Sequence, residues 1–249
     1  MAVILMKIFE ESPRKFDRWM QLLTLGRLER IQSEILASVQ PGEHFLEIGC
    51  GTGAFAAMLA RRGARVAGID ISEKMIVTAQ EKLREAGLQD QVEARRLHGL
   101  QVEDAFAEGT FDRVISVLAL SEMTEDEIDC LLPQCWKVLA AKGRFILVDE
   151  VVPERFSTRF CYTVYHFIAR LVTYLGLQAA EIKKANLPTK ILYFFIELPL
   201  ILLTFLVVPP ATQPLRHLEE RVKSSGFEIT RSKSYLGGTL KLLFAEKTS

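Results

Sequence analysis

Phe45-Leu46-Glu47-Ile48-Gly49-Cys50-Gly51-Thr52-Gly53 is a short apolar strand that runs directly into a glycine-rich turn. Glycine suits this turn because a side chain would keep a ligand away from the backbone, and because the turn needs backbone angles that other residues resist. Asp70 ends the next predicted strand, where a carboxylate can accept both ribose hydroxyls of an adenosine. Ligands of open α/β sheets bind at the carboxyl ends of such strands, so this stretch predicts a nucleotide-type site.

The rest of the chain alternates between short apolar strands and amphipathic helices. Strand, helix and strand at this spacing imply right-handed crossovers and a mostly parallel sheet. Near the C-terminus, a helix and two strands joined by the hairpin signal Gly237-Gly238 add an antiparallel pair. The pattern therefore predicts a doubly wound α/β fold with a seven-stranded sheet. The expected strands span 44–48, 65–69, 91–97, 112–117, 144–151, 227–235 and 239–246, and the expected helices span 53–62, 72–86, 124–140 and 214–225.

The chain divides into four segments. A length of 249 residues is enough for one substantial core and a small cap. Residues 1–40 are expected to form an N-terminal helical cap, and residues 41–153 the ligand-binding α/β core. Residues 214–249 complete the core with the last helix and the hairpin. Residues 154–213 do not fit the alternation and are interpreted as an insert between the fifth strand and the last helix.

The insert is aromatic and basic. Residues 155–208 hold ten aromatic side chains out of 22 in the chain, and 155–190 carry six basic side chains against one acidic. One interpretation is an interfacial membrane element with its lysines and arginines at anionic headgroups. Another is a soluble cap that encloses an apolar acceptor pocket. A spanning helix needs about 20 apolar residues, and Glu197 and Pro199 within the most apolar stretch disfavour one.

The overall composition excludes several classes of protein. Lysine plus arginine and aspartate plus glutamate each number 31, so no net charge points to nucleic acid. The four cysteines form neither a CxxC pair nor a His/Cys cluster at metal-ligand spacing, which predicts reduced thiols and no metal site. Residues 1–6 are too short for the apolar region of a signal peptide. We therefore expect a cytoplasmic protein, with peripheral contact to the inner face of the membrane if the insert is interfacial.

The spacing of the glycines helps to identify the cofactor. The dinucleotide fingerprint GxGxxG needs a third glycine to bring the helix close to its strand, whereas Gly49, Gly51 and Gly53 are spaced GxGxG. Glu47, just before the glycines, would repel a pyrophosphate but suits a cationic ammonium or sulfonium group. A carboxylate that caps loop amides is the alternative interpretation of Glu47. A nicotinamide oxidoreductase is the corresponding alternative function.

These residues resemble the class I S-adenosylmethionine-dependent methyltransferases, whose first motif reads E/D-x-G-x-G-x-G with an acidic residue ending the second strand. Residues 110–116, TFDRVIS, look like the family's fourth-strand motif. Residues 136–145, WKVLAAKGRF, resemble its turn into strand five. The resemblance covers roughly residues 12–153 and 214–246, and it implies S-adenosylmethionine as the cofactor.

The same resemblance implies which residues contact that cofactor. Glu47 would approach the methionine amino group and Asp70 the ribose. Ile71 and Met75 would flank the adenine, while Gly99 and Leu100 would face its amino edge. The family commonly has an acidic residue at that edge, and here backbone groups would replace it. The expected cofactor-binding residues are Glu47, Gly49, Cys50, Gly51, Gly53, Asp70, Ile71, Met75, Gly99, Leu100 and Val117.

A narrower likeness concerns the N-terminus and the loop after strand four. Residues 12–18, SPRKFDR, with residues 23–26, LTLG, and residues 119–127, ALSEMTEDE, look like the corrinoid protein-associated methyltransferases. This resemblance implies a gene neighbourhood with corrinoid proteins, and hence a corrinoid protein as a partner.

The loop after strand four opens beside the cofactor's methyl group in this fold. Ser121 and Glu122 are therefore the expected catalytic residues, in contact with the methyl acceptor. The alternative is a helix-entry motif, in which Ser121 or Thr124 caps the helix and residues 125–127 favour its dipole. Asp149 and Glu150, at the end of strand five, face the same cleft and have the same two interpretations.

Together these features predict a methyltransferase for a bulky, apolar acceptor: a lipid, a quinone precursor or a corrinoid. Methyl transfer from a sulfonium is a one-step displacement to which an enzyme contributes mainly alignment. A general base is needed only if the acceptor must lose a proton. The alternative is an accessory protein that binds the cofactor without turnover and docks a corrinoid protein or a membrane through residues 155–208. No nucleic-acid partner is expected.

Overall fold

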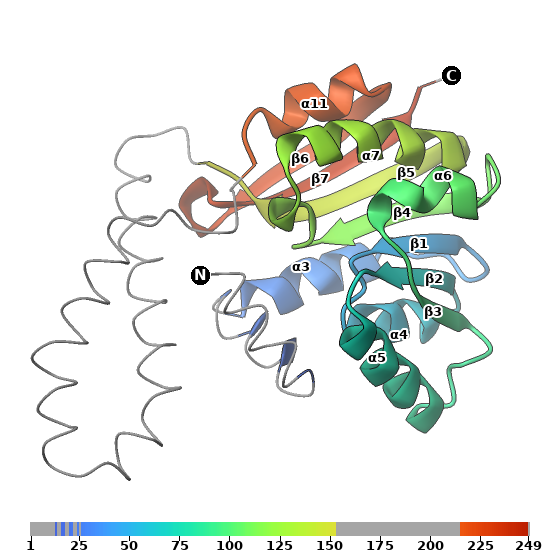
Figure 1. The fold of residues 1–249 in the computed structure, drawn as a ribbon. Helices are drawn as coiled ribbons and strands as arrows, with labels where there is room; N and C mark the ends of the chain where they lie inside the picture. The colour runs from blue at the N-terminus through green and yellow to red at the C-terminus, as the bar shows by residue number, and fades with distance from the viewer. Residues whose placement is uncertain are drawn as a thin grey trace, which may run out of the picture. The chain divides into compact units, whose positions relative to one another are not determined.

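The computed structural model describes residues 26–152 and 215–248, together with Pro13, Phe16, Asp17, Met20, Gln21 and Thr24. The strands are β1 (His44–Ile48), β2 (Arg65–Asp70), β3 (Val92–Arg96), β4 (Phe111–Val117), β5 (Leu139–Glu150), β6 (Phe227–Tyr235) and β7 (Leu240–Lys247). They form one sheet in the order β3-β2-β1-β4-β5-β7-β6 (Figure 1). Strands β1 to β5 run parallel, whereas β7 is antiparallel to β5 and β6. The predicted seven-stranded, mostly parallel fold is confirmed.

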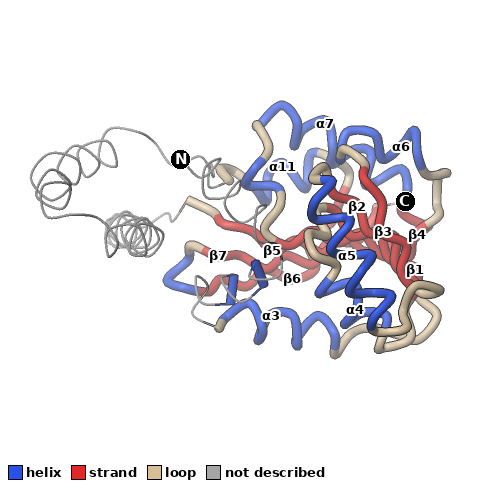
Figure 2. Tube along the Cα trace, turned by 60° about the horizontal axis from the view of Figure 1, so that its bottom comes forward, coloured by secondary structure: helices blue, strands red, loops and turns tan. Residues whose placement is uncertain are grey.

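Helices cover both faces of this sheet (Figures 1 and 2). Consecutive strand residues point to opposite faces, so Phe45 packs in one core and Leu46 in the other. Because both faces are covered, the central strands are apolar on both sides. The first face carries α3 (Arg27–Leu36), α4 (Ala54–Ala60) and α5 (Glu73–Glu85), and the second carries α6 (Val102–Ala105), α7 (Glu125–Val138) and α11 (Leu218–Ser224).

Local capping residues fix where two helices begin. The Ser72 hydroxyl accepts a hydrogen bond from the Met75 N–H at the start of α5. Thr124 and Glu127 form a reciprocal capping box at the start of α7. The helix-entry interpretation of this region therefore holds for Thr124, which caps α7, and not for Ser121.

Most elements lie within two residues of the expected bounds, but two boundaries differ by more and one helix was missed. Helix α7 ends at Val138, and β5 begins at Leu139 rather than at residue 144, because Leu139 already pairs with Phe111 across an irregularity in the ladder. Helix α11 begins at Leu218 rather than at residue 214, since Leu215 forms a bridge with Val151. Helix α6, which has only four residues, was not predicted, because it is too short to show a helical period.

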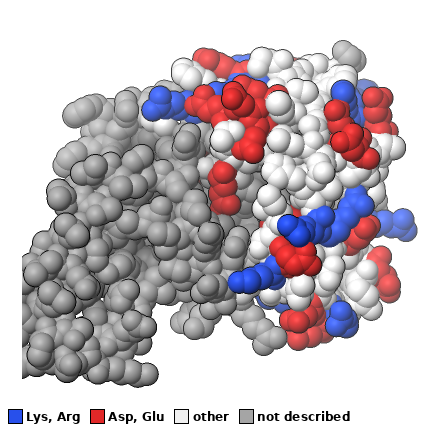
Figure 3. Space-filling model, viewed as in Figure 1, with Lys and Arg blue, Asp and Glu red and all other residues white. Residues whose placement is uncertain are grey.

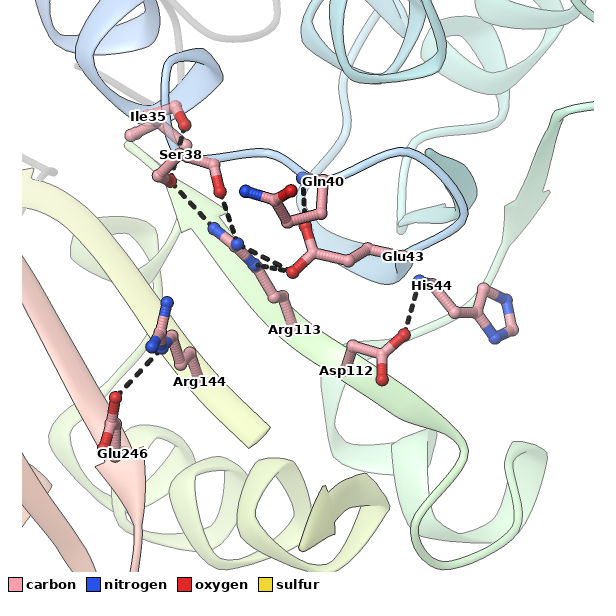
Figure 4. A network of polar contacts seen from close by, with 9 residues as sticks. All are labelled: Ile35, Ser38, Gln40, Glu43, His44, Asp112, Arg113, Arg144 and Glu246. Atoms are coloured by element: carbon pink, nitrogen blue, oxygen red, sulfur yellow. Dashed lines mark hydrogen bonds and ion pairs between the residues drawn. The ribbon is translucent and has the colours of Figure 1, made fainter. Parts of the chain in front are cut away.

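A buried ion pair holds the amino ends of β1 and β4 together (Figure 4). Arg113 of β4 is 2% exposed, and its guanidinium donates to Glu43 Oε1 at 2.7 and 2.9 Å. The same guanidinium donates to the hydroxyl and the carbonyl oxygen of Ser38 at 2.8 and 2.6 Å. This network fixes the loop between α3 and β1 at the edge opposite the predicted ligand site.

The predicted insert at 154–213 lies outside the described residues, as does most of the predicted N-terminal helical cap before Gly26. Among the helices that the structure does describe, none combines the length and the apolar character needed to cross a bilayer. The interpretation of 155–208 as an interfacial element or a cap therefore stays a prediction.

Candidate functional site

The glycine turn lies at the carboxyl ends of β1 and β2, next to the point where the strand order reverses. The N–H groups of Gly49 and Cys50 both donate to the carbonyl oxygen of Ile69, at 2.8 and 2.9 Å. Gly53 has a φ of 70° and is the N-cap of α4. The start of the turn is therefore bonded to the end of β2, and the turn leads directly into α4, as the sequence predicts.

Gly49 brings this turn against the segment that follows β4. Its φ is +73°, and a Cβ atom built on it would lie 2.3 Å from the Cβ of Ala119. Real Cβ atoms do not approach so closely, so only glycine allows the contact. The two loops expected to hold the cofactor and the acceptor are thus packed directly on each other.

Asp70 is held at the end of β2 by two backbone amides. Its Oδ2 accepts from the N–H of Gly51 at 2.8 Å, and its Oδ1 accepts from the N–H of Ser72 at 2.9 Å. Burial raises the pKa of Asp70, although these hydrogen bonds act in the opposite direction. Each carboxylate oxygen can accept a second hydrogen bond. Asp70 can therefore bind a vicinal diol while remaining fixed by the turn.

Glu47 is a buried carboxylate with an unsatisfied oxygen. The residue is 3% exposed, and its Oε2 has no hydrogen-bond partner. Burial first, and the charge of Asp70 second, raise the pKa of Glu47 to about 8, while a hydrogen bond from the Ala56 N–H lowers it. That hydrogen bond agrees with the amide-capping interpretation, but it leaves Oε2 unexplained. A buried acceptor beside a second carboxylate requires a donor, and a cation is the best one.

The remaining predicted cofactor residues lie in different environments. Ile71 follows Asp70 and is 59% exposed, which is unusual for a large apolar side chain. Met75 is buried at the start of α5, and Val117 is half-buried at the end of β4. At Leu100, the N–H already donates to His98 Nδ1 and the carbonyl oxygen already accepts from Gln134. Gly99 is the half-buried residue between them.

The segment after β4 is fixed by Asp149 at the end of β5. Leu118 has a φ of 57°, in the left-handed region that only glycine adopts without strain. The Asp149 Oδ2 accepts from the N–H groups of Leu120 and Ser121, at 2.8 and 3.2 Å, and the Ser121 hydroxyl bonds the same carboxylate. Burial raises the pKa of Asp149 to about 6. Of the two predicted catalytic residues, Ser121 is therefore buried and bonded to Asp149, and Glu122 is exposed.

Three residues that meet at the turn, Asp17, Thr52 and Lys82, were not predicted as site residues. The Thr52 hydroxyl donates to Asp17 Oδ1 at 2.7 Å, and Lys82 Nζ donates to Asp17 Oδ2 at 2.6 Å. No local pattern pairs Asp17 with a turn 35 residues later. The one signal is Thr52 itself, a polar side chain that is 1% exposed and that must find a partner.

The site fits a ligand that carries a cation at one end and a ribose at the other. Glu47 supplies the unsatisfied acceptor for the cation, and Asp70 supplies the free lone pairs for the diol. In the described ranges, no group of three or more His, Cys, Asp or Glu side chains is arranged to hold a metal ion.

On the face drawn in Figure 3, acidic and basic side chains lie interspersed rather than gathered by sign.

The chain matches the family model described as "Methyltransferase domain" over residues 45–143. An uncharacterized methyltransferase of Synechocystis sp. is 33% identical over 219 residues, which are 88% of this chain and 82% of that protein. A demethylmenaquinone methyltransferase of Symbiobacterium thermophilum is 28% identical, and the match covers 64% of either chain, just under two thirds. The solved magnesium protoporphyrin IX methyltransferase of Synechocystis with bound SAH has a TM-score of 0.62 at 20% identity, with 100% of both chains covered. At that identity the last likeness concerns the fold.

Proposed function

The chain belongs to the class I S-adenosylmethionine-dependent methyltransferases, and on this premise we propose that Glu47, the glycine turn and Asp70 hold the methyl donor. The observation that carries the proposal is the buried, unsatisfied Oε2 of Glu47 beside the amide-held carboxylate of Asp70. Glu47 binds the methionine ammonium, and Asp70 binds the ribose hydroxyls. Ile71, exposed next to Asp70, covers one face of the adenine.

S-adenosylmethionine supplies a methyl group on a positively charged sulfur, and the chain's own residues align it with the acceptor. Gly49 and Ala119 pack the donor turn onto the segment after β4. Asp149 fixes the backbone of that segment through Leu120 and Ser121. Held alignment of this kind lowers a displacement barrier by about 7–11 kcal/mol. Glu122 is the exposed carboxylate on this segment and contacts the acceptor, whereas Ser121 supports the loop.

For the methyl acceptor we propose a bulky, apolar, quinone-like molecule. The Symbiobacterium relative is named for demethylmenaquinone, and the aromatic composition of residues 155–208 suits a planar apolar ligand. A lipid or a corrinoid would also suit that composition, and both are outcomes of the test below. We further propose that residues 155–208 bring the protein to the inner face of the membrane, where such acceptors are found, from a cytoplasmic location.

The test supplies methyl-labelled S-adenosylmethionine to the purified protein with a native cell extract and then separates quinones, other lipids, corrinoids and proteins. We expect label in the quinone fraction, lost in Asp70→Ala and retained in Asp90→Ala, an exposed aspartate away from the turn. Label only in the corrinoid or the lipid fraction would replace the quinone acceptor by that class. Cofactor binding with no label in any fraction would favour the accessory protein that docks a corrinoid protein or a membrane.

A further inference from the structure

Asp17 connects a part of the chain before α3 to the glycine turn and to α5. Its two carboxylate oxygens bind different elements: Oδ1 accepts from the Thr52 hydroxyl at 2.7 Å, and Oδ2 accepts from Lys82 Nζ at 2.6 Å. Thr52 is the residue between Gly51 and Gly53, so the contact lies inside the turn itself. A single carboxylate therefore links three elements at the proposed cofactor site.

Phe16 lies against the same turn. A Cβ atom built on Gly51 would lie 3.7 Å from the Cε1 of Phe16, which is ordinary contact distance. The N–H of Gly51 donates to Asp70, the proposed ribose-binding residue. Phe16 and Asp17 thus cover the turn beside the carboxylate that would hold the cofactor.

Helix α5 is positioned to provide the Lys82 side of this connection. A Cβ atom built on Gly53 would lie 3.0 Å from the Cβ of Ala79, so α5 packs closely on the end of the turn. Lys82, one helical turn after Ala79, is therefore on the face of α5 that meets the turn. The side chains of Lys82 and Asp17 are 32% and 39% exposed, so solvent ions can reach the pair.

We propose that Asp17, bound by Thr52 and Lys82, retains the cofactor by holding Phe16 over the glycine turn. The inference rests on the proposed location of the cofactor at this turn. Exchange of S-adenosylmethionine or its product requires the Asp17 contacts to open. Asp17 is thus a positioning residue that sets the exchange rate and does not touch the reacting atoms.

The test measures how fast bound tritium-labelled S-adenosylmethionine leaves the full-length protein after an excess of unlabelled S-adenosylhomocysteine is added. We expect Asp17→Ala and Lys82→Met to speed this release about tenfold, since each removes a charge-assisted hydrogen bond. Lys82→Arg keeps the charge and should release at the wild-type rate. Glu103→Ala is the control, because it removes another partly exposed ion pair, with Lys137 on the other face of the sheet.

Salt and the double variant sharpen the result. Potassium chloride should speed release from the wild type but not from Asp17→Ala, since only the wild type has the pair to screen. Asp17→Ala combined with Lys82→Met should release no faster than Asp17→Ala alone. If Asp17→Ala does not fold, the release rates of Lys82→Met and Lys82→Arg are compared instead.

Two results would contradict the proposal, and they differ. Release rates within twofold of wild type, with a lowered melting temperature, would make the Asp17 contacts merely structural. No binding of labelled S-adenosylmethionine by the wild type would instead remove the proposed cofactor site itself.

Discussion

The carboxyl group of Glu47 is mostly protonated in the free protein at neutral pH, because burial and Asp70 raise its pKa to about 8. A bound ammonium or sulfonium reverses this by favouring the ionised form. Cofactor binding should therefore release close to one proton near pH 7, and affinity should rise with pH up to about 8. Calorimetry in buffers of different ionisation enthalpy measures the proton. Glu47→Gln should bind the cofactor more weakly and release no proton. If this variant releases as many protons as the wild type, the proton comes from the ligand and not from Glu47.

Gly49 allows the two functional loops to touch, and this contact makes a second prediction. Gly49→Ala forces a Cβ into the 2.3 Å contact with Ala119 and also strains a φ of +73°. Gly87→Ala is the matched control, with a φ of +67° and nothing within 4 Å. The control should lose about 1–2 kcal/mol of unfolding free energy from backbone strain. Gly49→Ala should lose a further 1–3 kcal/mol or so.

Urea unfolding measures both glycine variants on the same scale. Ala119→Gly should restore part of the loss in Gly49→Ala, because it removes the other atom of the clash. Equal losses at Gly49 and Gly87 would mean that the loops separate without cost, and that the contact does not align donor and acceptor.

Among the elements, the connection between β4 and the loop before β1 depends on a buried ion pair. Glu43→Ala would leave the Arg113 guanidinium, 3% exposed, without its carboxylate. Breaking a buried pair in this way costs about 3–5 kcal/mol. Figure 4 also shows Arg144 and Glu246, an exposed pair on β5 and β7 with side chains 50% and 40% exposed. Glu246→Ala should cost at most about 1 kcal/mol. If Glu43→Ala and Glu246→Ala have similar midpoints of urea unfolding, the hydrogen bonds from Arg113 to Ser38 are enough to stabilise the buried guanidinium.

The elements that the sequence predicts best are those with local signals. Strand β1 has the predicted bounds, α5 begins one residue after the predicted start of the helix at 72–86, and α7 begins after the predicted cap Thr124. The early start of β5 was missed because it depends on pairing between Leu139 and Phe111, which no local pattern encodes. Periodicity places elements, whereas register and irregularities in the ladder come from tertiary contacts.

The same contrast between local signals and tertiary contacts applies to the site. Glu47 and Gly51, in the strand-turn-helix, and Asp70, at the end of the next strand, were predicted as a group. The ties between distant segments were not: Asp17 to Thr52 spans 35 residues, and Leu120 to Asp149 spans 29. Their hydrogen bonds depend on how the loops fold over the sheet edge. Ser121 illustrates the limit, since its place in the loop suggested acceptor contact while its hydroxyl bonds Asp149.

For the molecule as a whole, the proposed role of Glu47 links cofactor binding to stability. A carboxyl group whose pKa is raised from 4.5 to about 8 on folding stabilises the protein at low pH, and this contribution is lost as pH rises through about 8. S-adenosylhomocysteine at 100 times its Kd should add about 2.7 kcal/mol, or roughly 5–10 °C in melting temperature. At pH 8, unliganded Glu47→Gln should melt higher than wild type and gain less from the ligand. If the unliganded wild type melts higher than Glu47→Gln at pH 8, an ionised Glu47 in the empty site does not destabilise the protein, and the prediction is wrong.

The unsatisfied oxygen of Glu47 has a consequence for the protein in the cell. Molecules that lack the cofactor open more often, and proteases act on the opened population. Degradation then removes empty molecules faster than filled ones. The abundance of the enzyme would follow the supply of the methyl donor, and its half-life would shorten when methionine is limiting, without any dedicated regulator.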